Sequence, residues 1–182
     1  MKEKVFFKIV KYFIENPYEE PYLREIAKRL KVSVFAMKDY ADHLVKEKIL
    51  VEKRVSNLRY LKLNMSSLFV KQMKIAYNIK RIEDSGILEY IKKEVPSLSS
   101  VILFGSMASG ENDKNSDVDL VIIGQSNMLK LSLQEFERKM GKEINYHVFT
   151  WAKWKKQEKE NKAFYVDVII KGIPLYGEMA AV

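Results

Sequence analysis

The chain has 182 residues, of which 47% are hydrophobic and 31% are charged, with a formal net charge of +8. This composition is typical of a globular protein with one large domain or two small ones. The absence of cysteine excludes disulfide bonds and thiolate metal sites, and no run approaches the roughly 20 apolar residues of a membrane span.

The first segment, residues 3–15, places apolar side chains at helical spacing and ends at Asn16 and Pro17. Lys8 and Lys11 interrupt this segment, whereas the apolar part of a signal peptide is continuous. We therefore expect a cytoplasmic protein that begins with a helix.

Two further helices and a hairpin are predicted next. Residues 22–30 repeat the helical pattern, and Ser33 is a suitable N-cap for a helix over residues 34–48. The runs ILVEKRV and LRYLKLN are rich in β-forming residues and flank Ser56 and Asn57, which predicts a β-hairpin.

Three helices followed by a basic hairpin, in residues 1–65, resemble the winged helix-turn-helix of small prokaryotic transcription regulators. The phrase EKILVEKRVSNLRYLKLN carries this resemblance. Residues 1–65 hold 15 Lys and Arg against 9 Asp and Glu, whereas residues 66–182 hold 17 against 15, and a local basic excess is expected where a protein contacts nucleic acid. In that family the third helix enters the major groove of duplex DNA and the wing contacts the backbone or the minor groove. The resemblance implies DNA contacts from Ser33, Phe35, Lys38, Lys53, Arg54 and Arg59.

A second interpretation assigns this helix and wing to protein contact, because Asp39 and Asp42 would bring negative charge toward DNA. Residues 66–95 are predicted to form a helical connector, and its first helix has a broad apolar face between Leu68 and Ile82. Winged-helix regulators usually read DNA as two-fold dimers. We therefore expect this face to pack between the domains or to form a homodimer.

Residues 100–104, SVILF, are predicted to form a short buried strand that leads directly into Gly105 and Ser106. Gly105 lets the backbone bend and approach a ligand closely, and the following N–H groups and the Ser106 hydroxyl can hold a phosphate. Further along, DVDLVII places Asp117 and Asp119 at i and i+2 of a strand, with both carboxylates on one face. Such carboxylates beside a phosphate-binding turn suit Mg²⁺, which prefers oxygen ligands and binds the phosphates of a nucleoside triphosphate.

The segment GSMASGENDKNSDVDLVI resembles the signature of the DNA polymerase beta-type nucleotidyltransferase superfamily, and most of all its minimal nucleotidyltransferases. The resemblance covers residues 85–176, with the signature within residues 103–123. It implies an α/β (α+β) domain over residues 96–182, with a mixed sheet flanked by helices. It also implies transfer of a nucleoside monophosphate from a Mg²⁺-bound triphosphate to a hydroxyl acceptor.

Active members of this superfamily carry a third carboxylate on a later strand, and the matching position in KEINYHVFT is Asn145. An amide is not a general base at neutral pH and brings no negative charge to a metal. Glu143 and His147 flank this position at i−2 and i+2, either as substitute bases or as a solvent-facing residue and a packing residue. Three functions stay open: a nucleotidyltransferase, a catalytically inactive nucleotide-sensing transcription regulator, and an antitoxin-like partner of a helical toxin.

Overall fold

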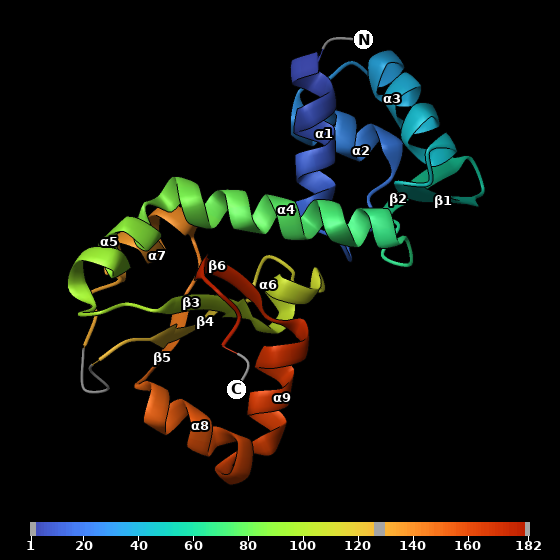
Figure 1. Cartoon of the computed structure of the whole chain (residues 1–182). Coiled ribbons are helices and arrows are strands. Elements are labelled where there is room, and N and C mark those ends of the chain that lie inside the picture. Colours follow the sequence, from blue (N-terminus) through green and yellow to red (C-terminus); the bar gives the residue numbers. More distant parts are fainter. Residues whose placement is uncertain (1–2, 126–129, 181–182) are drawn as a thin grey trace. The chain divides into compact units, whose positions relative to one another are not determined.

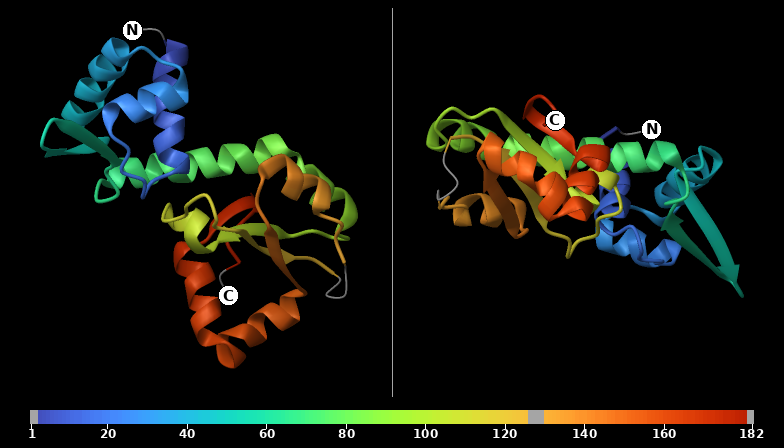
Figure 2. Two further views of the ribbon diagram at one scale, coloured as in Figure 1. Left: turned by 180° about the vertical axis from the view of Figure 1, so that it is seen from behind. Right: turned by 60° about the horizontal axis from the view of Figure 1, so that its bottom comes forward.

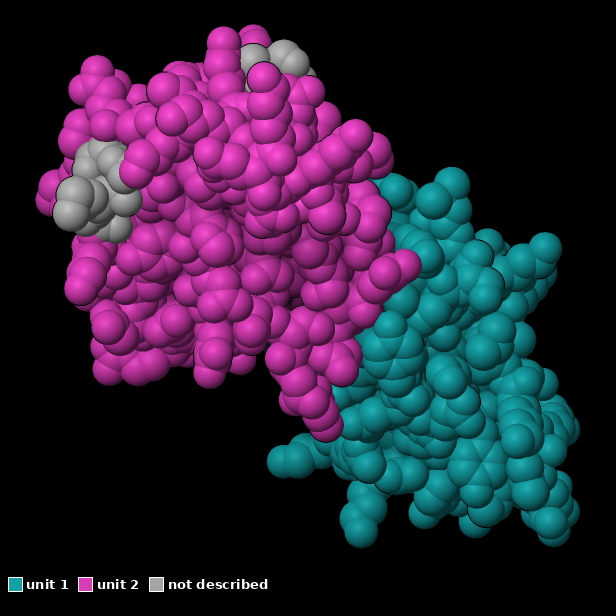
Figure 3. Space-filling view, turned by 90° about the horizontal axis from the view of Figure 1, so that it is seen from below, with its two compact units in different colours: residues 1–72 teal, residues 73–182 magenta. Residues whose placement is uncertain are grey.

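The structure, a computed structural model of the chain, describes residues 3–125 and 130–180. The chain divides into two compact units, Met1–Gln72 and Met73–Val182, coloured separately in Figure 3. This division falls inside helix α4 (Leu68–Ser85), within the stretch that the sequence predicts as a helical connector. Within the described ranges, no helix combines the length and apolar character needed to cross a membrane.

Unit 1 begins with three helices and a two-stranded hairpin, in the order expected from the sequence (Figure 1). Ser33 caps the third helix as predicted, because its hydroxyl accepts a hydrogen bond from the backbone N–H of Ala36 at 3.2 Å. This helix ends at Lys46, two residues before the predicted end. The bounds are α1 (Glu3–Glu15), α2 (Leu23–Leu30), α3 (Val34–Lys46), β1 (Leu50–Val55) and β2 (Leu58–Leu63).

The hairpin is anchored at its base and exposed at its tip. The strands pair antiparallel from Leu50 opposite Leu63 to Val55 opposite Leu58. Leu50 and Leu63 are buried, whereas Val55 and Leu58 are among the exposed large hydrophobic side chains. The backbone N–H of Leu61 donates to the carbonyl of Pro21 at 3.0 Å, which attaches β2 to the segment before α2.

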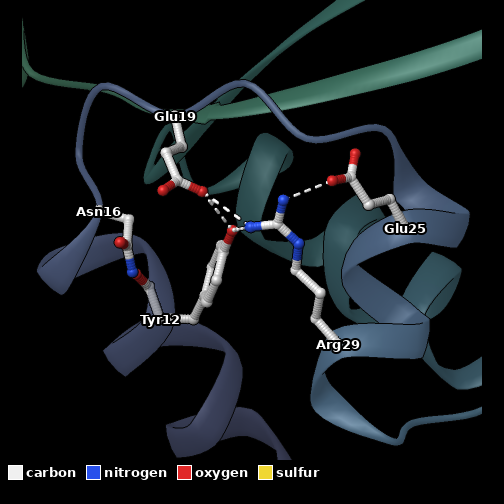
Figure 4. Close-up of polar contacts among 5 residues, drawn as sticks. All are labelled: Tyr12, Asn16, Glu19, Glu25 and Arg29. Carbon is white, nitrogen blue, oxygen red and sulfur yellow. Dashed lines mark hydrogen bonds and ion pairs between the residues drawn. The ribbon is translucent and has the colours of Figure 1, made fainter.

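A polar network joins α1, the turn after it and α2 (Figure 4). The Arg29 guanidinium donates to the Tyr12 hydroxyl at 2.8 Å, to Glu19 at 2.9 Å and to Glu25 at 2.5 Å. Tyr12 in turn donates to Glu19 at 2.8 Å. Burial, together with the nearby Glu19 carboxylate, raises the pKa of Tyr12 to about 12, so the phenol stays neutral and remains a donor.

Unit 2 contains a mixed four-stranded sheet with the strand order β5-β4-β3-β6. Strand β3 (Ser100–Phe104) pairs antiparallel with β4 (Val118–Ile123) and with β6 (Ile173–Gly177), and β4 pairs parallel with β5 (Ile144–Phe149). The predicted strand over residues 100–104 and the mixed sheet flanked by helices are both confirmed. The remaining helices are α5 (Ile87–Glu94), α6 (Gly105–Ser109), α7 (Gln134–Met140), α8 (Trp151–Glu160) and α9 (Lys162–Lys171).

The sheet is covered on both faces (Figures 1 and 2). Side chains alternate along β4, so that Leu120 and Ile122 join the core beneath α5 and α7, whereas Val121 and Ile123 join a second core beneath α8 and α9. Trp154 of α8 is fully buried in this second core, and its indole N–H donates to the carbonyl of Ala180 at 2.8 Å. By the same alternation Asp119 belongs to the face of the second core.

Candidate functional site

The turn at Gly105 joins β3 to the short helix α6. Phe104 lies opposite Asp119 in the β3–β4 register, so the residue after Phe104 lies beside the Asp119 carboxylate. Gly105 has φ +71°, and a Cβ at this position would meet Oδ2 of Asp119 at 2.6 Å. A side chain is therefore disfavoured here by both the backbone conformation and the approach of the carboxylate.

The two aspartates converge on Asn145. Strand β4 begins at Val118, so Asp117 lies just before the strand and not within it as the sequence predicted. Asp119 lies directly opposite Asn145 in the parallel β4–β5 pairing. The Asn145 amide nitrogen donates to Oδ2 of Asp117 at 3.2 Å and to Oδ1 of Asp119 at 3.3 Å. Since both carboxylates reach one nitrogen, they point to one small region of space.

The electrostatic environment of Asp119 disfavours a second negative charge in this region. Burial raises the pKa of the Asp119 carboxyl above its ordinary value, and the charge of Asp117 raises it further. The hydrogen bond from Asn145 and the nearby His147 oppose this shift. A bound cation would offset the same repulsion, so the carboxylate pair is suited to a positively charged ligand.

The donor set suits Mg²⁺ that is shared with a substrate. Among residues 3–125 and 130–180, no group of three or more His, Cys, Asp or Glu side chains is placed to hold a metal ion. Asp117 and Asp119 supply two carboxylates, and rotation of the Asn145 amide would turn its oxygen toward the same region. Because Mg²⁺ usually keeps waters and phosphate oxygens in its octahedral shell, two carboxylates are a sufficient protein contribution.

Glu143 and His147 occupy different environments near Asn145. Glu143 is exposed and precedes β5, and its backbone carbonyl accepts a hydrogen bond from Val118 at 2.9 Å. His147 lies on the same strand face as Asn145 and is exposed. Its ring lies 5.4 Å from that of Phe164 and 6.2 Å from that of Phe149, measured between centroids. His147 therefore has packing partners as well as a position beside the carboxylates.

In unit 1, the beginning of α3 and the tip of the β1–β2 hairpin line a surface hollow of about 590 Å³. Lys38 and Arg54 line it together with Phe35, whose side chain is 76% exposed. Lys53 is exposed on β1. Most of the side chains predicted to face DNA thus lie on the surface of one unit, while the hydroxyl of Ser33 is used as the cap of α3.

Arg59, on β2, is less exposed than the other basic residues of the hairpin. Its side chain is only 14% exposed and forms ion pairs with Asp42 of α3 and Glu52 of β1, each at 2.5 Å. Its charge is thus already balanced within unit 1. Because it is paired in this way, Arg59 connects the hairpin to α3 and is poorly available for phosphate contact. The expectation from the sequence did not include these two carboxylates.

Comparison with known proteins identifies a family match that lies within unit 2. A family model, described as the nucleotidyltransferase domain, matches residues 84–175. Among curated proteins, the protein adenylyltransferase MntA of Shewanella oneidensis is 21% identical over 70 residues, which is 38% of this chain. The chain spans 50% of the length of that relative.

Two solved structures are also similar at low identity. A toxin–antitoxin complex with AMP-PNP contains a chain with 18% identity and a TM-score of 0.36, with coverage of 50% of this chain and 71% of that chain. A variant of the MntA–HpeT toxin–antitoxin complex gives 17% identity and a TM-score of 0.38, with the same coverage.

Proposed function

The chain belongs to the nucleotidyltransferase domain family, and from this premise we propose that unit 2 binds a nucleoside triphosphate together with Mg²⁺. The observation that carries the proposal is the convergence of Asp117 and Asp119 on one point beside the turn at Gly105. Two carboxylates that share a region with a close backbone turn can hold a cation and the phosphates that the cation binds.

Each residue of the site has a proposed role. Asp117 and Asp119 are the metal ligands, and the backbone at Gly105 and the hydroxyl of Ser106 bind the triphosphate. When bound, Mg²⁺ would neutralise the negative charge that develops as pyrophosphate leaves. Asn145 donates hydrogen bonds and orients groups near the carboxylates, but it does not accept a proton from an acceptor hydroxyl. We therefore propose nucleotide binding with slow transfer of a nucleoside monophosphate.

His147 is the residue best placed to act as a substitute base, because it shares the strand face of Asn145 and remains exposed. A hydroxyl on a protein is one acceptor class that we propose, since the matched relative is a protein adenylyltransferase. The antitoxin-like alternative, in which this chain is the partner of a helical toxin, stays open beside the enzyme. In the sensor alternative, the nucleotide is bound but not consumed.

For unit 1 we propose binding to duplex DNA through α3 and the wing. Support comes from exposed Lys38, Lys53 and Arg54, together with the excess of basic residues in this part of the chain. The alternative, contact with a protein, is motivated by exposed Phe35.

A homodimer stays a prediction. Leu68 and Phe69 at the start of α4 are 72% and 62% exposed. Light scattering at micromolar concentration tests whether the protein is a dimer.

The transfer reaction is tested with nucleoside triphosphates labelled in the α-phosphate. The protein is incubated with Mg²⁺ and each triphosphate, alone, with nucleic acid, and with cell extract. We expect weak label transfer that depends on Mg²⁺ and disappears in Asp117→Ala/Asp119→Ala. Nucleotide binding without any transfer, in the presence of every acceptor, would favour the sensor alternative over the enzyme.

A further inference from the structure

Residues 107–116, between Ser106 and Asp117, are called the spacer. Buried polar side chains that have no role in the proposed chemistry hold this segment. Among the residues that the structure describes, buried polar side chains are few, and four of them lie in this spacer or contact it. They are Lys74, Asn78, Asn112 and Lys142. Buried ammonium groups are costly unless they are well bonded, so their gathering at one segment calls for an explanation.

Lys142 holds the end of the spacer that leads into Asp117. Its ammonium group donates to three backbone carbonyls, those of Asp113 at 3.0 Å, Lys114 at 3.2 Å and Ser116 at 2.6 Å. Three donors thus meet three acceptors, which satisfies the whole ammonium group. Since Ser116 directly precedes Asp117, the ammonium group restrains the backbone from which that carboxylate projects.

Lys74 and Asn78 of α4 hold the other end, next to α6. The Lys74 ammonium donates to the carbonyl of Asn112 at 2.5 Å. The Asn78 amide donates to the Asn112 side chain at 2.8 Å and to the carbonyl of Met107 at 3.0 Å. The backbone of Asn112 is in turn bonded to Ser106, whose carbonyl accepts its N–H at 3.2 Å.

Within the spacer, local bonds make the chain compact. The Asp113 carboxylate accepts a hydrogen bond from the N–H of Asn115 at 2.9 Å and another from the Ser116 hydroxyl at 3.0 Å. These bonds lower the pKa of Asp113, so the carboxylate stays ionised near the ammonium groups of Lys74 and Lys142. The spacer is therefore a bonded element and not a free loop.

We infer that Lys74 and Lys142 are positioning residues, which fix Asp117 relative to the turn at Gly105 and Ser106. The inference rests on the proposed function of unit 2. A metal shared between two carboxylates and a triphosphate requires both carboxylates at a set distance from the phosphate-binding turn. Asp119 is placed by the β-sheet, but Asp117 precedes β4 and is placed by the spacer. Neither lysine is proposed to contact the metal or the nucleotide.

Calorimetry with ATP tests the inference, in the presence of Mg²⁺ and in the presence of EDTA. Lys142→Met and Lys74→Met keep the apolar stem and remove the donors, and Lys142→Arg keeps both charge and donors. Lys80→Met is the control, because Lys80 lies on the same helix as Lys74 but is exposed and pairs with Asp84. We expect Lys142→Met to weaken Mg²⁺-dependent binding by about tenfold or more, with a smaller effect in Lys142→Arg and none in Lys80→Met.

Combining Lys142→Met with Asp117→Asn shows whether Lys142 positions Asp117 or only stabilises the fold. If Lys142 acts through Asp117, the second substitution leaves little for the first to remove, and the effect of Lys142→Met falls to roughly twofold or less. Equal losses in both backgrounds would overturn the inference, as would full Mg²⁺-dependent affinity in folded Lys142→Met. Absence of ATP binding by the wild-type protein would instead overturn the proposed function.

Should the methionine variants not fold, hydrogen exchange on the wild-type protein provides the test. Amides of residues 111–117 should exchange slowly without nucleotide, at rates comparable to those of β4, because the buried lysines already hold the spacer. Exchange as rapid as that of the exposed tip of the wing would show that the spacer is not held and would overturn the inference.

Discussion

Asp119 and Asn145 lie opposite each other on the parallel strands β4 and β5, and the Asn145 amide donates to the Asp119 carboxylate at 3.3 Å. The same amide donates to Asp117 at 3.2 Å. Asn145 therefore bridges the two carboxylates with a neutral donor, at the strand position where a third carboxylate is expected in active members of the family that the chain resembles. The bridge lowers the repulsion between the two aspartates.

Asn145→Asp should reverse this effect. Without Mg²⁺, a third carboxylate that replaces the bridging donor should lower the free energy of unfolding by about 1–3 kcal/mol. With Mg²⁺, the added charge should strengthen metal binding, recover much of that stability and raise the rate of label transfer. Thermal unfolding with and without Mg²⁺, followed by the transfer assay, provides the measurement. A variant that is as stable as wild type without Mg²⁺ would show that the hydrogen bonds of Asn145 contribute little.

Gly105→Ala should remove metal and nucleotide binding because a Cβ would displace the Asp119 carboxylate. Gly141→Ala is a matched control: Gly141 also has a positive φ, +61°, but a Cβ there would meet nothing within 4 Å. Both variants should lose about 1–2 kcal/mol from backbone strain, and only Gly105→Ala should lose Mg²⁺-dependent ATP affinity. Equal affinity in the two variants would mean that the close approach at Gly105 is not required.

Much of the fold and part of the site could be predicted because they depend on residues that are close together in the sequence. Ser33 caps α3 through a residue three positions away, and Gly105 follows a strand whose five apolar or small residues identify it. The spacing of Asp117 and Asp119 predicts that their carboxylates lie together, as their shared donor Asn145 shows, but Asp117 precedes β4 and does not belong to the strand as expected. These features depend on backbone geometry over a few residues, which sequence patterns report directly.

The rest depends on contacts between distant segments. Lys74 and Lys142 look like ordinary solvent-facing lysines in the sequence, but their partners lie 38 and 26 to 29 residues away. The sequence suggests that Arg59 is an exposed basic residue of the hairpin, but Asp42, 17 residues earlier, pairs with it. Periodicity cannot reveal a buried ammonium group whose acceptors are backbone carbonyls, because every residue carries a carbonyl.

Lys74 should make the stability of unit 2 depend on pH. Burial lowers the pKa of Lys74 from 10.5 to about 8, an effect opposed by Asp113 and reinforced by Lys142. Between about pH 8 and 10.5 the unfolded chain binds a proton that the folded protein has lost, so stability should rise with pH, by about 3 kcal/mol in total. Chemical denaturation from pH 7 to 10.5 should show this rise in wild type and not in Lys74→Met.

The comparison between wild type and Lys74→Met is needed because ionisation of Tyr12 lowers the stability of the protein as the pH rises. Its pKa is raised to about 12 in the folded protein, so its contribution to stability is lost as the pH rises above 10. Tyr12 is unchanged in Lys74→Met, and its effect cancels in the difference. A pH-independent difference between the two proteins would contradict the assignment of the rise to Lys74.

DNA binding by unit 1 should depend on the wing. Lys53→Glu/Arg54→Glu should weaken binding to duplex DNA about tenfold or more and reduce the slope of log affinity against log salt concentration by about 2. Lys155→Glu/Lys156→Glu makes the same change of charge on exposed positions of α8 and is the control. Fluorescence anisotropy over a salt series measures both quantities. Wild-type affinity in the wing variant, or loss in the α8 variant, would contradict the proposed DNA surface.

Calorimetry with ATP and Mg²⁺ tests whether Asp117 and Asp119 hold Mg²⁺ and a nucleoside triphosphate beside Gly105. Wild type is compared with Asp117→Asn/Asp119→Asn, which keeps the shape of both side chains and removes both charges. We expect binding at one site in wild type that requires Mg²⁺ and is lost in the folded double variant. Undiminished Mg²⁺-dependent binding by that variant, or no nucleotide binding by wild type, would contradict this proposal.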